Sequence, residues 1–268
     1  MTRFYYRRLR TDGEFEVLES TGATGSNWDG GIQHGSPPLA LLTKLVEDSL
    51  DGTTGPRLRV GRLVMDILGP IPVAPVRVRA WTERPGSRIS LRTAEMQAQR
   101  PDGSWRAVAR LSAWLLAVSD TADVATDRHP PLQEGPVVGE PHAWHGAPGY
   151  LETIDFRRQE SAGESGTVAW MTPLARVVDT DDPTPLQRLA MVVDSANGIG
   201  AVLDPNRFVF MNTDTTVHLH RLPVGDDFAV RARASIGPDG IGVTTAEVFD
   251  RQGFVGTCAQ TLLVQRLG

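Results

Sequence analysis

The 268-residue chain lacks several features that would each indicate a particular class of protein. It has one cysteine, Cys258, so neither an internal disulfide nor a cysteine-only zinc site can form. Its 27 basic residues are outnumbered by 32 acidic ones, and the net charge of −5 argues against nucleic-acid binding. No apolar run approaches the ~18 residues of a membrane helix, and the arginine-rich start lacks the apolar segment of a signal peptide. We therefore expect a cytoplasmic protein that does not insert into membranes.

Lysine and several catalytic motifs are also scarce or missing. All basic residues except Lys44 are arginines, and Lys44 lies in an apolar segment typical of a core helix, which argues against Schiff-base chemistry. The G-x-S-x-G elbow, H-E-x-x-H, the Walker loop and G-x-G-x-x-G are all absent. His142 and His145 form an H-x-x-H near His129, which we interpret as scattered loop histidines. No metal and no cofactor are expected.

What the chain does contain is an internal repeat. The triplets VRA at 78–80 and TAE at 93–95 recur at 230–232 and 245–247, with the same spacing. Each copy reads as two strands joined by a glycine-containing turn, followed by a second turn and a last apolar strand. The order of these matches indicates a duplication.

The segment between the copies marks the domain boundary. It is rich in proline, glycine and charge and has no sustained hydrophobic period, as expected of a linker. We predict an N-terminal repeat over 1–119, a linker over 120–149 and a C-terminal repeat over 150–268.

Each repeat contains one long apolar stretch, at 37–50 and at 184–203, where we predict a helix. Both stretches begin with prolines, which suit a first helical turn, and neither has a clean polar stripe, so both helices should be buried. Asn197 and Gly198 are expected to end or kink the second one. An antiparallel sheet wrapped around a central helix, present twice, is an α+β double hot-dog fold.

Three polar residues interrupt apolar segments of the second repeat. Asp194 lies in the predicted buried helix, where an unpartnered carboxylate costs several kcal/mol, so it needs hydrogen-bond donors unless the helix reaches solvent there. Gln260 shares a strand face with Cys258 and Leu262, which is a core face unless the strand lies at an edge. Asn212 stands at the end of an apolar strand segment.

The segments VVDSANG, MNTDTTVHLHR and CAQTLLVQ resemble the C-terminal hot-dog of acyl-CoA thioesterase II-type enzymes. In that family an Asp on the helix, a Ser or Thr on the next strand and a Gln on the last strand hold and activate a water molecule. The resemblance implies these roles for Asp194, Asn212 and Gln260. Asn212 departs from the pattern because it is an amide where the family has a hydroxyl, and Thr213 should face the opposite side.

The first repeat has its own motif, GIQHGSPPLALL. It resembles the His-Gly-Gly start of the helix in single-domain hot-dog thioesterases, with Ser36 in place of the second glycine. The resemblance implies that His34 and Gly35 bind substrate, with the Gly35 N–H polarising the thioester carbonyl. The alternative is that Gly35 only opens the helix.

The first repeat does not carry the polar set of the second. The acidic position on its helix falls near Thr43, and Gln260 corresponds by the repeat to Arg110. We therefore expect one working site per chain.

The sequence thus favours an acyl-CoA thioesterase that uses a water held by Asp194, Asn212 and Gln260, with acyl-CoA as its small-molecule partner. The alternatives are a non-catalytic acyl-CoA-binding protein and a hot-dog enoyl-CoA hydratase, whose G-D-x-N-P-x-H loop is absent. The exposed faces of a double hot-dog usually associate, so we expect a homo-oligomer.

Overall fold

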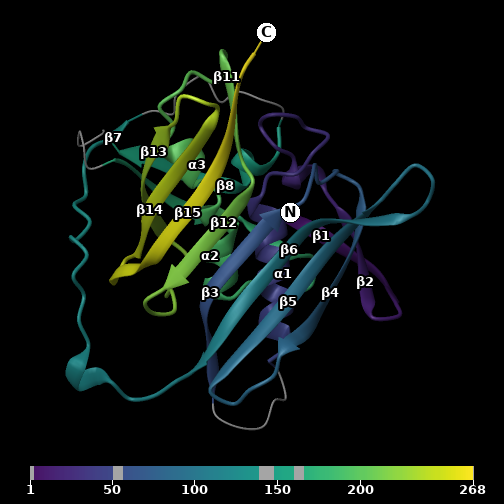
Figure 1. Ribbon diagram of the computed structural model, residues 1–268, viewed down its shortest axis with the longest axis horizontal. Coiled ribbons are helices and arrows are strands. Elements are labelled where there is room, and N and C mark those ends of the chain that lie inside the picture. The colour runs from purple at the N-terminus through teal and green to yellow at the C-terminus, as the bar shows by residue number, and fades with distance from the viewer. Residues whose placement is uncertain (1–2, 51–56, 139–147, 160–165, 268) are drawn as a thin grey trace.

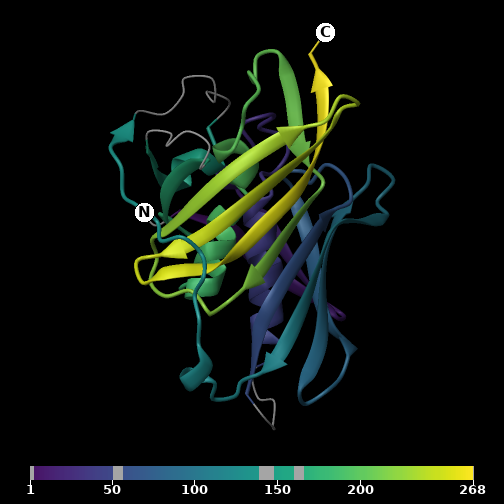
Figure 2. The same ribbon diagram turned by 60° about the vertical axis from the view of Figure 1, so that its left-hand side comes forward.

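The computed structural model describes residues 3–50, 57–138, 148–159 and 166–267, and Figures 1 and 2 show the chain from two sides. In these ranges the N-terminal half contains β1 (Arg3–Asp12), β2 (Phe15–Ser20), α1 (Ser36–Asp48), β3 (Leu58–Ile67), β4 (Pro75–Arg84), β5 (Ile89–Gln99) and β6 (Trp105–Ala117). The rest contains β7 (Val137–Val138), β8 (Ile154–Gln159), β9 (Thr167–Pro173), β10 (Ala175–Val178), α2 (Pro185–Val193), α3 (Ala196–Ile199), β11 (Phe208–Asn212), β12 (Asp214–Leu219), β13 (Phe228–Ile236), β14 (Ile241–Asp250) and β15 (Gly253–Arg266). Short 3-10 turns lie at Gly22–Thr24, Ala122–Val124 and Tyr150–Thr153.

The strands form one continuous sheet that passes through both halves of the chain. Its order is β10-β1-β2-β4-β5-β6-β3-β12-β15-β14-β13-β9-β8-β7, with β11 paired to β15. The two halves meet where β3 pairs antiparallel with β12, as Val64 opposite Thr216 shows. β10 pairs in parallel with β1, so a strand of the second half extends the sheet of the first.

Helix α1 begins as the prolines of the sequence suggest and is buried on nearly all sides. Pro37 and Pro38 occupy its first turn, where a missing N–H costs no hydrogen bond. Ten of its 13 residues are buried, which explains the absence of a polar stripe.

The second helix is shorter than predicted, so the expectation of one helix over 184–203 is wrong. Thr184 caps α2 by accepting a hydrogen bond from the Gln187 N–H at 3.2 Å, and α2 ends at Val193. Asp194 and Ser195 separate it from α3, which ends at Ile199. The kink therefore falls at Asp194, before Asn197 and Gly198, because the Asp194 side chain is held by the neighbouring strands.

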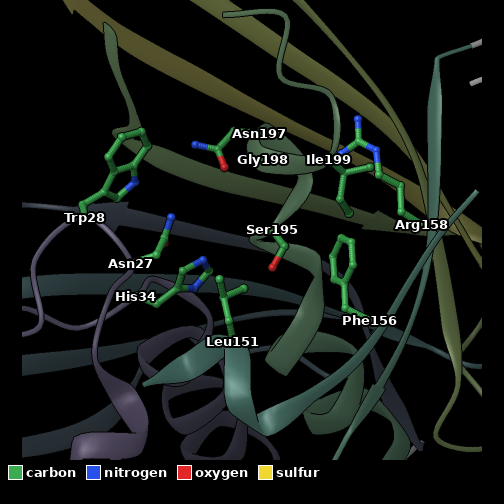
Figure 3. Close-up of a pocket in the computed structure, with 10 residues that line it drawn as sticks. All are labelled: Asn27, Trp28, His34, Leu151, Phe156, Arg158, Ser195, Asn197, Gly198 and Ile199. Atoms are coloured by element: carbon green, nitrogen blue, oxygen red, sulfur yellow. The ribbon is translucent and has the colours of Figure 1, made fainter. Parts of the chain in front are cut away.

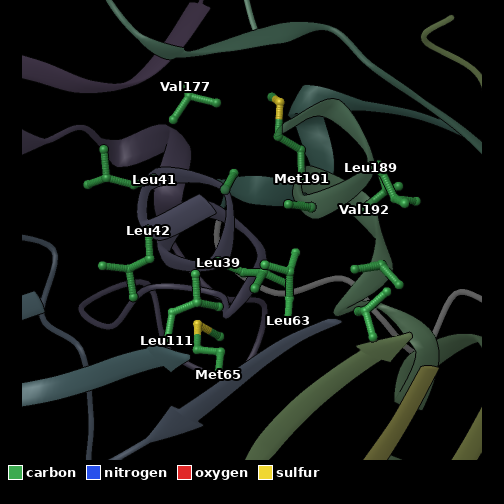
Figure 4. Packing of buried hydrophobic residues seen from close by; sticks show 14 of the residues in the cluster. Leu39, Leu41, Leu42, Leu63, Met65, Leu111, Val177, Leu189, Met191 and Val192 are labelled. Atoms are coloured by element: carbon green, nitrogen blue, oxygen red, sulfur yellow. The ribbon is translucent and has the colours of Figure 1, made fainter. Parts of the chain in front are cut away.

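The helices pack against each other under the sheet and share one hydrophobic core (Figures 1 and 4). The core cluster joins α1, α2 and strands of both halves, including Leu39, Leu42, Met65, Leu111 and Val192. Burying a side chain of this size contributes roughly 1.5–3 kcal/mol. Because the core is shared, the relative position of the two helices is fixed.

This arrangement confirms the predicted α+β double hot-dog fold. The exact boundaries at 119 and 150 stay predictions. In the described ranges, no helix combines the length and apolar character needed to cross a bilayer.

Candidate active site

Asp194 closes the C-terminal end of α2, and its side chain is buried. It follows a run of buried apolar residues, and only 2% of its surface is exposed. Beyond it lies the first turn of α1, whose cap residue is Gly35. The N-terminus of a helix favours a negative charge, so α1 offers this carboxylate a suitable electrostatic environment.

Donors from three positions on the strands converge on one carboxylate oxygen, Asp194 Oδ1. Asn212 Nδ2 donates to it at 2.8 Å, Thr215 Oγ1 also donates to it, and Gln260 Nε2 lies at 3.3 Å. Gln260 Nε2 also donates to the Asp194 backbone oxygen and to Thr215 Oγ1, each at 2.9 Å. The structure thus brings together Asp194, Asn212 and Gln260, and their catalytic role stays a prediction.

Thr215 is the member of this cluster that the sequence analysis missed. Phe210 and Asn212 face inward on β11, whereas Thr215 and Val217 face inward on β12. The inward-facing positions are thus even-numbered on β11 and odd-numbered on β12. The shift occurs at Thr213, whose N–H donates to Thr261 and whose carbonyl accepts from Ile67. Regular alternation would instead have turned Thr215 outward, and the run of polar residues from 212 to 216 was the available signal.

Gly35 lies directly against the second carboxylate oxygen. A Cβ on residue 35 would lie 2.8 Å from Asp194 Cγ and closer still to Oδ2. Gly35 has a φ of −68°, which any residue can adopt, so the close approach is what requires glycine here. No acceptor for the Gly35 N–H is present in the described part of the chain.

His34 lies beside the same oxygen. Its Nδ1 is 3.7 Å from Asp194 Oδ2 and accepts a hydrogen bond from the Ser36 N–H at 3.1 Å. Its ring stacks on Tyr150, with centroids 3.9 Å apart. Burial lowers the pKa of His34, against the opposing effect of Asp194. The ring is therefore neutral at pH 7, with its proton on Nε2.

A pocket opens next to this cluster (Figure 3). It has about 590 Å³ of empty volume, a figure that includes its open side. Its lining consists of Asn27, Trp28, His34, Leu151, Phe156, Arg158, Ser195, Asn197, Gly198 and Ile199. His34 and Ser195 form the wall toward Asp194, so the carboxylate lies behind the surface of the pocket.

The counterparts in the first repeat differ from those expected. The alanine of the first TAE motif pairs with Leu111 and the alanine of the second pairs with Cys258, so Leu111 and Cys258 are equivalent positions. Two residues further along the strand, Gln260 therefore corresponds to Ala113 and not to Arg110. The first hairpin is longer, and this shifts the offset between the copies on the last strand. Ala113 is buried and apolar, whereas Arg110 faces outward and pairs with Glu95.

The helix counterpart of Asp194 can also be assigned. Counted from the Pro-Leu pair that opens each helix, it is Glu47. Glu47 Oε2 accepts hydrogen bonds from Thr184 Oγ1 and Gln187 Nε2, each at 2.8 Å. It thus meets the start of α2 as Asp194 meets the start of α1.

No group of His, Cys, Asp and Glu side chains suited to a metal ion occurs among the described residues. His142 and His145 lie outside those residues. The ring of His129 stacks on Phe254, with centroids 3.7 Å apart, and its Nδ1 lies 3.4 Å from a Glu247 oxygen. These contacts fit a structural role for His129.

Two family models match the chain: the N-terminal domain of acyl-CoA thioesterases over residues 24–116 and the C-terminal domain over 131–264. A search of curated protein sequences found no match. A protein of Alicyclobacillus acidocaldarius described as having a hot dog fold is 18% identical, with a TM-score of 0.72 over 97% of this chain and 96% of its own.

Two further solved structures carry functional names. An acyl-CoA thioesterase II of Mycobacterium marinum is 15% identical, with a TM-score of 0.65 over 97% of this chain and 95% of its own. The dehydratase GphF is 13% identical, with a TM-score of 0.55 over 100% of this chain and 99% of its own. At these identities the structures support the fold, and the two family models decide the family. The chain therefore belongs to the acyl-CoA thioesterase II-like family of double hot-dog proteins.

Proposed function

We propose that the chain hydrolyses an acyl-CoA thioester, with Asp194 as the general base for an attacking water. The observation that carries the proposal is the arrangement of the Asp194 carboxylate. Oδ1 accepts from Asn212 and Thr215 with Gln260 alongside, while Oδ2 faces the glycine that opens α1. One oxygen is thus held in place, and the other is directed toward the helix start where a carbonyl would bind.

Gln260 supports this role with a second observation. Its Oε1 is buried and accepts no hydrogen bond from the residues that the structure describes, although an unsatisfied buried acceptor costs about 1–3 kcal/mol. A water molecule in the site would donate one O–H to Gln260 Oε1 and the other to Asp194. The orphaned oxygen therefore fits a site that holds the nucleophile.

The reaction follows from these positions. As the water oxygen bonds to the carbonyl carbon, Asp194 takes a proton from it. The N–H of Gly35 donates to the oxyanion that forms. The C–S bond then breaks with its electron pair on sulfur, which gives the carboxylic acid and a thiolate. The thiolate takes up the proton held by Asp194, which forms the thiol and restores the Asp194 carboxylate. A thiol with a pKa near ~8.5 leaves without a strong acid, so the absence of a cationic donor at Asp194 is compatible with turnover.

A non-catalytic acyl-CoA-binding protein is the second candidate. The observation that favours it is the burial of Asp194 behind His34 and Ser195, since the carboxylate does not itself line the pocket. The hydratase alternative gains no support from the site, where no histidine is hydrogen-bonded to the Asp194 carboxylate in the described residues.

The test is thiol release from acyl-CoA of increasing chain length, followed with a free-thiol reagent, together with calorimetric binding of the same compounds. Thiol release on at least one chain length, with free acid as the second product, supports hydrolysis. Tight binding of acyl-CoA without release would instead establish the binding protein and reject the hydrolase.

A further inference from the structure

The pocket beside Asp194 contains one permanently charged side chain, Arg158. The other lining residues are apolar, amide or hydroxyl groups, glycine and the neutral ring of His34, and no carboxylate is among them. Figure 3 shows Arg158 and Phe156 on the side of the pocket away from Trp28 and His34, with Ser195 between the two sides. The cation therefore lies across the pocket from His34, one of the residues between the pocket and Asp194.

Strand β8 places this arginine at the pocket. Phe156 and Arg158 are two residues apart, so they share one strand face, and both line the pocket. β8 pairs with β9 on one side, where Ala169 lies opposite Arg158, and with β7 on the other, where Val138 does. Neither neighbour has a side chain that can accept a hydrogen bond.

The neighbouring arginine on β8, Arg157, has the contacts expected of an arginine with only a structural role. Arg157 faces the other way, donates to Thr172 Oγ1 at 2.8 Å and pairs with Asp227. The Arg158 side chain has no hydrogen-bond or ion-pair partner in the described part of the chain, although it is partly buried. Burial lowers the pKa of Arg158, with no carboxylate opposing that effect.

The Arg158 guanidinium is thus held at the pocket without an anion beside it, and its donors are free for a ligand. Its planar set of donors matches a carboxylate or a phosphate in a bidentate manner. We propose that Arg158 binds an anionic oxygen group of the thioester substrate, either a carboxylate at the far end of the acyl chain or a phosphate of the carrier. The inference rests on the proposed function for the identity of the ligand as a thioester.

The experiment compares four ligands with wild type and Arg158→Gln. Hexanoyl-CoA and adipoyl-CoA have the same number of acyl carbons and differ in a terminal carboxylate. The corresponding hexanoyl and adipoyl pantetheine thioesters lack the phosphates. Both KM and the calorimetric Kd are measured, so a chain that binds without releasing thiol still tests Arg158.

Loss of one charge-assisted bidentate contact is expected to raise KM or Kd about 10- to 100-fold. If the partner is the acyl carboxylate, the loss appears for both adipoyl ligands and not for the hexanoyl ones. A phosphate partner gives a loss for both CoA ligands and not for the pantetheine ones. Arg158→Lys should recover part of the loss in either case, because it keeps the charge without the fork.

Arg10→Gln is the matched control, because it removes one charge from an exposed position on β1, away from the pocket. An Arg158→Gln effect equal to that control on all ligands overturns the proposal. So does an equal loss on all four ligands, including hexanoyl pantetheine, which carries no anion.

Discussion

At each end of the antiparallel pair of α1 and α2, a carboxylate from one helix lies against the start of the other helix. At one end Asp194, which closes α2, meets the start of α1 at Gly35. At the other end Glu47, in the last turn of α1, meets the start of α2 at Thr184. Each carboxylate faces the N-terminus of the opposite helix, where a negative charge is favoured.

The ends differ in what surrounds the carboxylate. At the Glu47 end the donors come from α2 itself, through the side chains of Thr184 and Gln187. Lys44 lies nearby and pairs with the half-exposed carboxylates of Asp48 and Asp181, each at 3.0 Å. Glu47 therefore caps a helix in a salt-bridged surface region, and burial raises its pKa above the ordinary value.

At the Asp194 end the donors come from the strands, and the cap position of α1 is a glycine. The strand donors hold one oxygen only, and Gly35 allows the start of α1 to lie directly against the other. A pocket lined by apolar and polar side chains, Arg158 among them, adjoins this end. The double hot-dog scaffold thus supplies a carboxylate at both ends, and in the proposed function the glycine and the strand amides distinguish the Asp194 end as the catalytic one.

Replacing each carboxylate in turn should give the largest difference in activity between the two ends of the helix pair. Asp194→Asn removes the proposed base, and we expect thiol release to fall about 10²- to 10⁴-fold, the usual contribution of general base catalysis. Glu47→Gln keeps an acceptor for Thr184 and should leave activity within about twofold, since no catalytic group is lost. Equal losses of thiol release in both variants, with circular dichroism showing that both are folded, would remove the distinction between the two ends.

The next largest loss of activity is expected for a substitution of Gly35. In Gly35→Ala the new methyl group collides with the Asp194 carboxylate and displaces it, and displacement of a catalytic group by about 1 Å costs on the order of 10²-fold in rate. Gly22→Ala is the matched control, because a Cβ there meets nothing within 4 Å. An active Gly35→Ala variant would mean that Oδ2 is not the reactive oxygen.

The hydroxyl donors offer a smaller contrast. Thr215→Val and Thr184→Val each remove one donor to a carboxylate, at opposite ends of the helices. Each should destabilise the fold by about 1–2 kcal/mol, measured by urea unfolding. Only Thr215→Val should also lower kcat, by roughly tenfold, and Thr215→Ser should restore it. An unchanged kcat in Thr215→Val would exclude Thr215 from the site.

The smallest effect concerns pH. Burial lowers the folded-state pKa of His34, so the unfolded chain takes up this proton first as the pH falls. The contribution of neutral His34 to stability is therefore complete above the ordinary pKa of about 6.5 and is lost as the pH falls below it. His34→Gln should show a weaker decrease in unfolding free energy between pH 7 and pH 5. Parallel pH profiles for the two proteins would contradict the assignment.

Much of the fold was predictable from the sequence, because the repeat and the two apolar stretches are local patterns. Asp194 and Gln260 were recognisable since a charged or amide group in an apolar segment needs partners. The break in the helix at Asp194 was not, because strands distant in the sequence supply the donors that hold the side chain there.

The sequence predictions that were wrong or incomplete depend on the register of the strands. Thr215 turns inward only because the strand phase shifts at Thr213. Arg110 was matched to Gln260 because a sequence offset does not reveal that one hairpin is longer than the other. The anion-binding role proposed for Arg158 required the pocket, since neighbouring arginines on β8 look alike in the sequence.

The most direct test of the account asks where the oxygen of the attacking water goes. A single turnover with enzyme in excess over acyl-CoA, run in water labelled with heavy oxygen, should place the label in the released acid and none in the protein. Label in the Asp194 carboxylate, found by mass spectrometry of its peptide, would show that Asp194 itself attacks the thioester and would contradict its role as the base.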